Sequence, residues 1–113
     1  MIEVSVLQYL NSVLTNKVYM EVPKSMPKKF YVLEKTGGGL LNHISKSSFA
    51  LQAYGESMYE AAEMLYTAKD FLLADTFLEL SEICSIEWDG EYNFTDETQK
   101  KYRYQAVFSV THY

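Results

Sequence analysis

The spacing of the hydrophobic residues changes along this chain, and the order of the changes limits the folds it can adopt. Helical spacing occurs over residues 2–14 and 58–72. Alternation with a period of two, which is typical of half-buried strands, occurs over residues 17–22, 30–35, 49–54, 83–88 and 102–111. The predicted order is therefore α-β-β-β-α-β-β. In 113 residues this order predicts a single α+β domain over residues 1–113, with a small antiparallel or mixed sheet and two helices packed on one face.

The second predicted helix has the clearest start. Ser57 and Glu60 match a capping box, in which the serine hydroxyl accepts a free backbone N–H and the glutamate reaches back toward the cap. Gly55 supplies the turn from the preceding strand. The apolar stripe that follows is made by Met58, Ala61, Ala62, Leu65, Ala68 and Leu72. We expect this helix to cover the sheet.

Two segments beside the predicted strands have unusual backbone chemistry. Residues 23–29 hold both prolines and three lysines, which predicts a basic loop between two strands. Residues 37–48 open with three glycines and end in a polar run, which predicts a long mobile loop or an extended hairpin. We also expect a polar turn region over residues 89–101.

The charge balance argues against several classes of partner. Ten basic and fifteen acidic residues give a formal charge of −5, so the average field repels phosphate backbones and anionic lipid. We therefore expect neither sequence-specific nucleic-acid binding nor a membrane partner. Glu3 stands where a secretion signal would carry Lys or Arg, and the single Cys84 forms no internal disulfide. These features predict a protein of the reducing cytoplasm.

Catalytic and ligand-binding motifs are weak in this sequence. The glycine triplet lacks the Gly-Lys-Ser/Thr tail of a phosphate-binding loop. Cys84 with His43 or His112 would make a nucleophile and base, but a free Cys in a predicted strand is more often a small buried hydrophobe. The two histidines and the cysteine lack the paired spacing of a zinc site. We expect no catalytic residue, no metal and no cofactor.

Acidic and aromatic residues favour surface roles. Five acidic residues flank Trp88, namely Glu79, Glu82, Glu87, Asp89 and Glu91. They form either a solvated acidic rim or a surface complementary to Lys24, Lys28 and Lys29 of a neighbouring copy. The ten tyrosines exceed what a small core uses, so many should reach the surface. Protein contacts and a half-exposed sheet face explain them equally well.

One part of the chain carries an ordered series of motifs between about Val18 and Ala68. It reads VYMEVP over 18–23, MPKKFYVLEKTGGG over 26–39 and LQAYGES over 51–57, and then enters an Ala-rich helix at Glu60. This order of strand, Pro-rich turn, strand, strand and helix resembles the small tail-terminator proteins of long-tailed bacteriophages and prophages, which are also called tail-completion or head–tail joining proteins.

The resemblance implies a structural role without enzymatic activity. Such proteins form a ring, commonly hexameric, on the head-proximal end of the finished tail tube, where they stop its polymerisation and present a surface to the neck proteins of the head. The implied partners are thus sister copies, the tail tube protein and a head–neck connector protein. The implied location is the virion, assembled in the bacterial cytoplasm. The segment 37–48 matches the region that projects toward the tube or a neighbouring subunit, and an acidic ring would suit a channel through which DNA must slide.

The expected assembly surface comprises Pro23, Lys24, Pro27, Lys28, Lys29, Gly37, Gly38, Gly39, Leu40 and Leu41. Another phage neck or head-completion factor is the alternative among structural proteins. A small hydrolase built on Cys84 and a histidine is the alternative among enzymes. A binder of single-stranded nucleic acid, which would need a basic groove, is disfavoured by the net charge.

Overall fold

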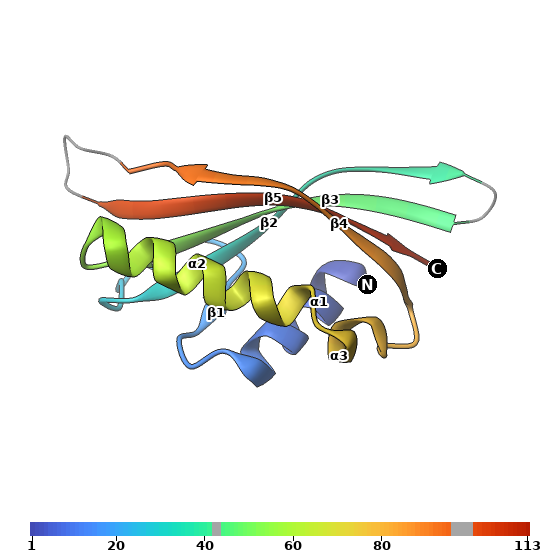
Figure 1. The fold of residues 1–113 in the computed structure, drawn as a ribbon, viewed down its shortest axis with the longest axis horizontal. Coiled ribbons are helices and arrows are strands. Elements are labelled where there is room, and N and C mark those ends of the chain that lie inside the picture. Colours follow the sequence, from blue (N-terminus) through green and yellow to red (C-terminus); the bar gives the residue numbers. More distant parts are fainter. Residues whose placement is uncertain (42–43, 96–100) are drawn as a thin grey trace.

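The structure is a computed structural model that describes residues 1–41, 44–95 and 101–113. Its elements, in chain order, are α1 (Ile2–Val13), β1 (Val18–Tyr19), β2 (Phe30–Leu41), β3 (Ile44–Gly55), α2 (Met58–Leu72), α3 (Asp75–Leu78), β4 (Ile83–Asn93) and β5 (Tyr102–His112). The strands form a five-stranded sheet in the order β1-β2-β3-β5-β4. All three helices lie on the same side of this sheet (Figure 1).

The predicted fold class is confirmed: this is a small α+β domain with a mixed sheet. The pairs β2–β3, β3–β5 and β4–β5 are antiparallel, and β1 pairs parallel with β2. The helix α3 was not predicted, because four residues are too short to show a helical period. Its Phe77 is fully buried and joins the core.

The main core lies between the sheet and the helices. Alternate residues of the strands point to one side, where Leu51 and Phe108 pack with Leu10 of α1 and Leu65 of α2. Phe108 stands between two other aromatic rings, with its centroid 5.4 Å from Phe49 and 5.8 Å from Trp88. We call this the helix side of the sheet. The opposite side, which carries residues such as Gln52, Gln105 and Ser109, is called the open face.

The serine half of the expected capping box at the start of α2 is confirmed, whereas Glu60 binds the residue before the cap Ser57 and not the cap itself. The Ser57 hydroxyl accepts the Glu60 N–H at 3.1 Å, and the Glu60 carboxylate accepts the Glu56 N–H at 2.8 Å. Gly55 is required here by close approach, because a Cβ at this position would lie 2.8 Å from the backbone nitrogen of Ala61. The chain therefore passes tightly from β3 into α2.

Two strand predictions, and the turn region after the second strand, need correction. The strand expected over 17–22 is reduced to Val18–Tyr19, because β1 pairs with β2 through those two residues alone before the chain enters the loop that holds both prolines. β4 continues past Trp88 to Asn93, into the expected polar turn region. A register irregularity between Trp88 and Gly90, with φ of 152° at Gly90, accommodates the extra residue. Part of the expected turn, residues 96–100, lies outside the described residues.

The segment 37–48 is an extended hairpin and not a loop. β2 and β3 pair continuously up to Leu41 and Ile44, with one irregularity between Lys35 and Gly37. Pairing of β3 with β5 runs to Ser45 and His112, so in the described residues only the Leu41–Ile44 pair lies beyond β5. The hairpin projects past the helices at one end of a molecule that measures 45 × 24 × 24 Å (Figure 1).

Candidate assembly surface

The residues expected to mediate assembly lie in two separate places. Pro23, Lys24, Pro27, Lys28 and Lys29 belong to the loop between β1 and β2, which we call the proline loop. Gly37 to Leu41 form the outer half of β2 in the projecting hairpin. The proline loop leads into the Phe30–Tyr54 end of the β2–β3 ladder, and the hairpin ends at the Leu41–Ile44 pair. The two groups are thus at opposite ends of the sheet (Figure 1).

The proline loop borders a small apolar cluster on the open face. Phe30 stacks on Tyr54 with ring centroids 4.5 Å apart, and Tyr19 meets the Phe30 ring edge-on at 6.1 Å. Val32 is fully buried in the same cluster. Met26, Pro27 and Lys28 line a depression of about 140 Å³ next to these rings. The loop thus packs partly on its own subunit, while Lys24 and Lys28 stay exposed.

Lys29 is used within the subunit. Its ammonium lies 3.1 Å from the Glu60 carboxylate. Hydrogen bonding and charge attraction from Glu60 raise the pKa of Lys29 above its ordinary value. The pKa of Glu60 is lowered, first by the backbone N–H of Glu56 and then by Lys29. Lys29 therefore fastens the end of the proline loop to the start of α2.

Two glycines of the hairpin have no evident role inside the subunit. A Cβ at Gly37 or Gly39 would have no heavy atom within 4 Å, and neither backbone lies in the left-handed region. Gly38 is more confined, because its Cβ would meet the Lys46 carbonyl oxygen at 3.3 Å. Glycine within a strand lowers stability and often marks a place where another backbone approaches closely. Gly37 and Gly39 thus leave bare backbone on a projecting strand.

The sheet has two open edges, one along the part of β2 that the short β1 does not cover and one along β4, and the two edges carry different residues. Within the described residues, β1 covers the outer edge of β2 only at Tyr31 and Val32, and β4 is paired only with β5. The uncovered part of β2 carries Lys35 and the glycines, whereas β4 carries acidic residues. An open edge is a template for pairing with another chain.

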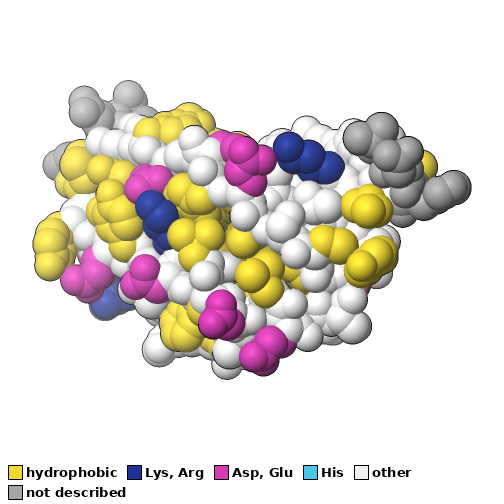
Figure 2. Space-filling view, turned by 45° about the vertical axis from the view of Figure 1, so that its right-hand side comes forward, with side chains coloured by type: hydrophobic (Ala, Val, Ile, Leu, Met, Phe, Trp, Pro, Cys, Tyr) yellow, Lys and Arg dark blue, Asp and Glu magenta, His cyan; other side chains and the backbone are white. Residues whose placement is uncertain are grey.

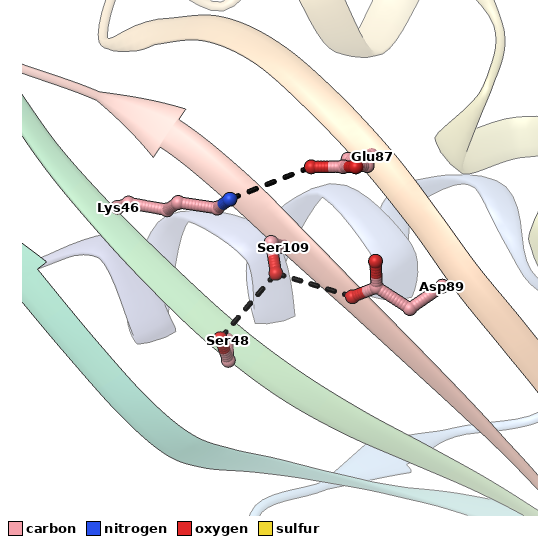
Figure 3. A network of polar contacts seen from close by, with 5 residues as sticks. All are labelled: Lys46, Ser48, Glu87, Asp89 and Ser109. Atoms are coloured by element: carbon pink, nitrogen blue, oxygen red, sulfur yellow. Dashed lines mark hydrogen bonds and ion pairs between the residues drawn. The ribbon is translucent and has the colours of Figure 1, made fainter.

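Polar side chains connect three strands across the open face. The Lys46 ammonium lies 3.4 Å from the Glu87 carboxylate. The Ser48 and Ser109 hydroxyls are 3.3 Å apart, and the Ser109 hydroxyl donates to the Asp89 carboxylate at 3.2 Å (Figure 3). These contacts join β3, β5 and β4 below the hairpin. The Lys46–Glu87 pair is exposed, so it exchanges easily with other charged partners.

The acidic residues around Trp88 divide between the two sides of the sheet. Glu87 and Asp89 lie on the open face as part of the expected acidic rim. Glu91 instead lies on the helix side, 3.1 Å from the Lys69 ammonium, and accepts the Trp88 indole N–H at 2.7 Å. The indole and then Lys69 hold the pKa of Glu91 below its ordinary value. Glu91 therefore stabilises the α2–β4 contact.

The expectation of a buried Cys84 is wrong. A register irregularity between Ile83 and Ser85 leaves Cys84 unpaired, and its side chain is exposed. Hydrogen bonding to Cys84 raises the pKa of the Tyr113 hydroxyl.

His112 is buried and does not lie free as a base for Cys84. Its Nδ1 is 3.1 Å from the Tyr113 carbonyl oxygen, and its Nε2 is 2.8 Å from the Ser47 hydroxyl. Because a carbonyl only accepts, Nδ1 donates to Tyr113, and Nε2 is engaged by the Ser47 hydroxyl. The other candidate base, His43, lies outside the described residues.

The tyrosines divide between core and surface. Tyr9 and Tyr31 are buried, whereas Tyr59 and Tyr66 are 77% and 48% exposed. The two exposed rings flank Ala62 in a shallow groove on the outer side of α2. Hydrophobic side chains gather over α2 and again beside the hairpin (Figure 2). Ala62 was expected in the apolar stripe that faces the core, so this groove was not predicted. The seven-residue spacing of Tyr59 and Tyr66, which puts both rings on one face of the helix, is the signal that indicates it.

Metal ligands and membrane-spanning helices are two further features that the described part of the chain could carry. No group of three or more His, Cys, Asp and Glu side chains there is arranged to hold a metal ion. None of the helices described has the length and apolar character needed to cross a membrane. No model of a known protein family and no curated protein matches this chain.

Proposed function

We propose that this chain is a structural protein of a bacteriophage or prophage, and that its copies form a ring on the head-proximal end of the tail tube. The ring would end tube polymerisation and present the surface that joins tail to head. Its partners would be sister copies, the tail tube protein and a head–neck connector protein. In this proposal the chain works through its surfaces and uses no catalytic residue or cofactor.

The observation that carries the proposal is the projecting β2–β3 hairpin. Its β2 strand has no described partner on its outer side from Leu33 onward, carries the 71% exposed Leu40, and holds two glycines, Gly37 and Gly39, that nothing in the described subunit requires. Exposed leucine and bare strand backbone are costly features for a lone monomer. They are accounted for if a neighbouring chain covers them.

A ring also needs two unlike surfaces on each subunit. In a closed head-to-tail assembly every copy presents one patch to the next copy and a different patch to the previous one. The hairpin carries Lys46 at its outer end, and α2, on the other side of the sheet, carries the exposed Glu63. The basic and the acidic residues thus lie on different parts of the molecule. This separation supports a head-to-tail contact between copies, in which unlike surfaces meet, and not a symmetric dimer.

The motif order that suggested the family runs through contiguous elements. Residues 18–68 comprise β1, the proline loop, the β2–β3 hairpin and most of α2. The resemblance and the hairpin geometry therefore concern the same part of the chain. We propose a hexamer, the common state in the family that the chain resembles. A net charge of −5 per subunit would keep DNA from adhering to the channel.

The proposal is tested by polymerising a tail tube protein of the same genome with and without this chain, and measuring tube lengths by electron microscopy. We expect shorter tubes that carry a ring at one end, and we expect this effect when far fewer copies of this chain than of the tube protein are present. Leu40→Asp should abolish the effect. Tyr59→Asp, which alters a side chain of similar exposure at the start of α2, should leave it intact. Tube lengths that do not respond to the wild-type chain would refute the proposal.

A further inference from the structure

Two distant parts of the molecule carry exposed side chains of complementary chemistry. On the hairpin half, α3 leads into β4 at Ile83, which pairs with His112 beside Ser45 of the hairpin. The proline loop lies at the opposite end, next to the stacked rings of Phe30 and Tyr54. The longest dimension of the molecule is 45 Å, and α3 and the proline loop do not meet within one copy (Figure 1).

The depression beside the proline loop, about 140 Å³ in volume, is apolar with a basic border. It is lined by apolar and aromatic side chains, namely Met26, Pro27, Phe30, Tyr54 and Tyr102. Among the described residues, its lining also includes Lys28 and Lys101 and no acidic side chain. Arg103 adds positive charge nearby, because its guanidinium donates to the Tyr54 hydroxyl at 3.3 Å. We call this site the proline-loop depression.

The short helix α3 presents an exposed leucine between two carboxylates. Leu78 is 40% exposed, whereas Phe77 beside it is fully buried. Residues three and four apart share a helix face, so Asp75 lies on the same outward side as Leu78 and Glu79. Both carboxylates are exposed, and neither forms an ion pair with any residue that the structure describes. This side of α3 therefore offers one apolar side chain flanked by negative charge.

The size and charge of this side of α3 match the proline-loop depression. A cavity of about 150 Å³ accepts a group the size of benzene, so the depression has room for one leucine side chain. The two carboxylates beside Leu78 are opposite in sign to the two lysines that line the depression. Burying the leucine there would remove apolar surface from water on both partners. A second copy of this chain is therefore an occupant of fitting chemistry.

We propose that Leu78 of one copy seats in the proline-loop depression of the next copy. The carboxylates beside it then approach the partner's Lys28 and the partner's Lys101. Each copy carries both of these unlike surfaces, so the contact is head-to-tail and repeats from copy to copy. This inference rests on the proposed ring and names two surfaces that join its subunits. It gives a role to Glu79, which the sequence left open between a solvated rim and a surface complementary to a neighbour's lysines.

Disulfide trapping tests the contact directly. Cys84→Ser removes the native thiol, and Leu78→Cys with Met26→Cys places one thiol on α3 and one at the depression. Mild oxidation should give a ladder of covalent multimers, whereas each single-cysteine chain should stop at dimers. The matched control pairs Leu78→Cys with Tyr66→Cys. Tyr66 is 48% exposed and Met26 is 47% exposed, but Tyr66 lies on α2 and does not line the depression. No ladder, or an equal ladder with the control, would overturn the inference.

Exchanging the charges of the contact gives a second test. Glu79→Lys and Lys28→Glu each place like charges against each other at every junction. Each should weaken self-association, measured by sedimentation, by roughly fivefold to tenfold. The chain with both substitutions has opposite charges at the junction again and should recover wild-type self-association. The control combines Lys28→Glu with Glu63→Lys, an exposed position on α2, and should not recover. No recovery in the first chain, or equal recovery in the control, would contradict the inference.

The two proposals fail in different ways. If wild-type rings cap tail tubes but residues 78 and 26 do not cross-link, the contact is wrong and the tail function stands. If residues 78 and 26 cross-link into a ladder but tubes are not capped, the head-to-tail contact stands and the tail function is wrong. Occupation of the depression by a tube or connector protein would appear as a cross-link from Met26→Cys to that protein in place of a ladder, and it would overturn the self-contact.

Discussion

Replacing Gly39 by threonine separates what the fold requires from what assembly requires. A Cβ at Gly39 meets no heavy atom within 4 Å, and the backbone there is open to any residue. Threonine favours strands, and removing a glycine narrows the unfolded ensemble, so the isolated subunit should gain about 0.5–1 kcal/mol in free energy of unfolding. The same branched side chain covers the bare backbone of the hairpin. We therefore expect a more stable subunit that no longer assembles.

Gly55→Ala also replaces a glycine of the β2–β3 hairpin, but at a position where no space is left for a side chain. Its Cβ would lie 2.8 Å from the backbone nitrogen and 3.1 Å from the Cα of Ala61. Both are backbone atoms of α2, so the start of the helix must shift. A forced shift of packed backbone costs about 1–3 kcal/mol. We expect Gly55→Ala to lose stability although it adds the smaller side chain.

Both variants are measured by urea unfolding at a concentration where the chain is monomeric. Trp88 is the single tryptophan and stacks on Phe108 in the core, so its fluorescence reports on the folded sheet. With a slope of about 1.5 kcal/mol per molar urea, the Gly39→Thr midpoint should rise by roughly 0.3–0.7 M. Sedimentation then measures assembly. A midpoint that falls as far as that of Gly55→Ala, or normal assembly of Gly39→Thr, would refute this reasoning.

Three further outcomes are expected. Leu33→Ala should lower the free energy of unfolding by about 3 kcal/mol, because Leu33 is only 1% exposed. Leu40→Ala, at an exposed position, should change it by less than about 0.5 kcal/mol. Equal losses of stability in urea unfolding would show that Leu40 is buried and would contradict this. The pKa of Glu91 is lower in the folded state than its ordinary value of 4.5. The stabilisation that ionised Glu91 gives to the fold is therefore complete above pH 4.5, and it is lost as the pH falls through the pKa of Glu91 in the folded state. Glu91→Gln should thus be less stable than wild type at neutral pH and approach it in acid, and a gap that widens in acid would contradict this. Cys84→Ser should leave tube capping unchanged, and loss of a measured turnover in that variant would favour the hydrolase.

Local chemistry in the sequence was sufficient to predict most elements. The capping box at Ser57 and Glu60 marks the start of α2 because its hydrogen bonds are made within one turn. The alternation around Leu51 and Phe108 predicts which side chains face the core, because a strand has a fixed period of two. These signals depend on neighbours along the chain.

Features that depend on tertiary pairing were left open or were not predicted. The sequence allowed either a loop or an extended hairpin at Gly37 to Gly39, and pairing with β3 makes this run a strand. Cys84 is exposed because a register irregularity turns it outward, which its apolar neighbours do not reveal. All three lysines of the proline loop were expected in the assembly surface; Lys24 and Lys28 are exposed, but Lys29 is paired with Glu60 of its own subunit.

Native mass spectrometry of the chain, alone and with the tube protein, is the most direct test of whether its copies form a closed ring. The account predicts one closed oligomer of fixed subunit number, and its loss in Leu40→Asp. A chain that stays monomeric at every concentration, with or without the tube protein, would contradict the account.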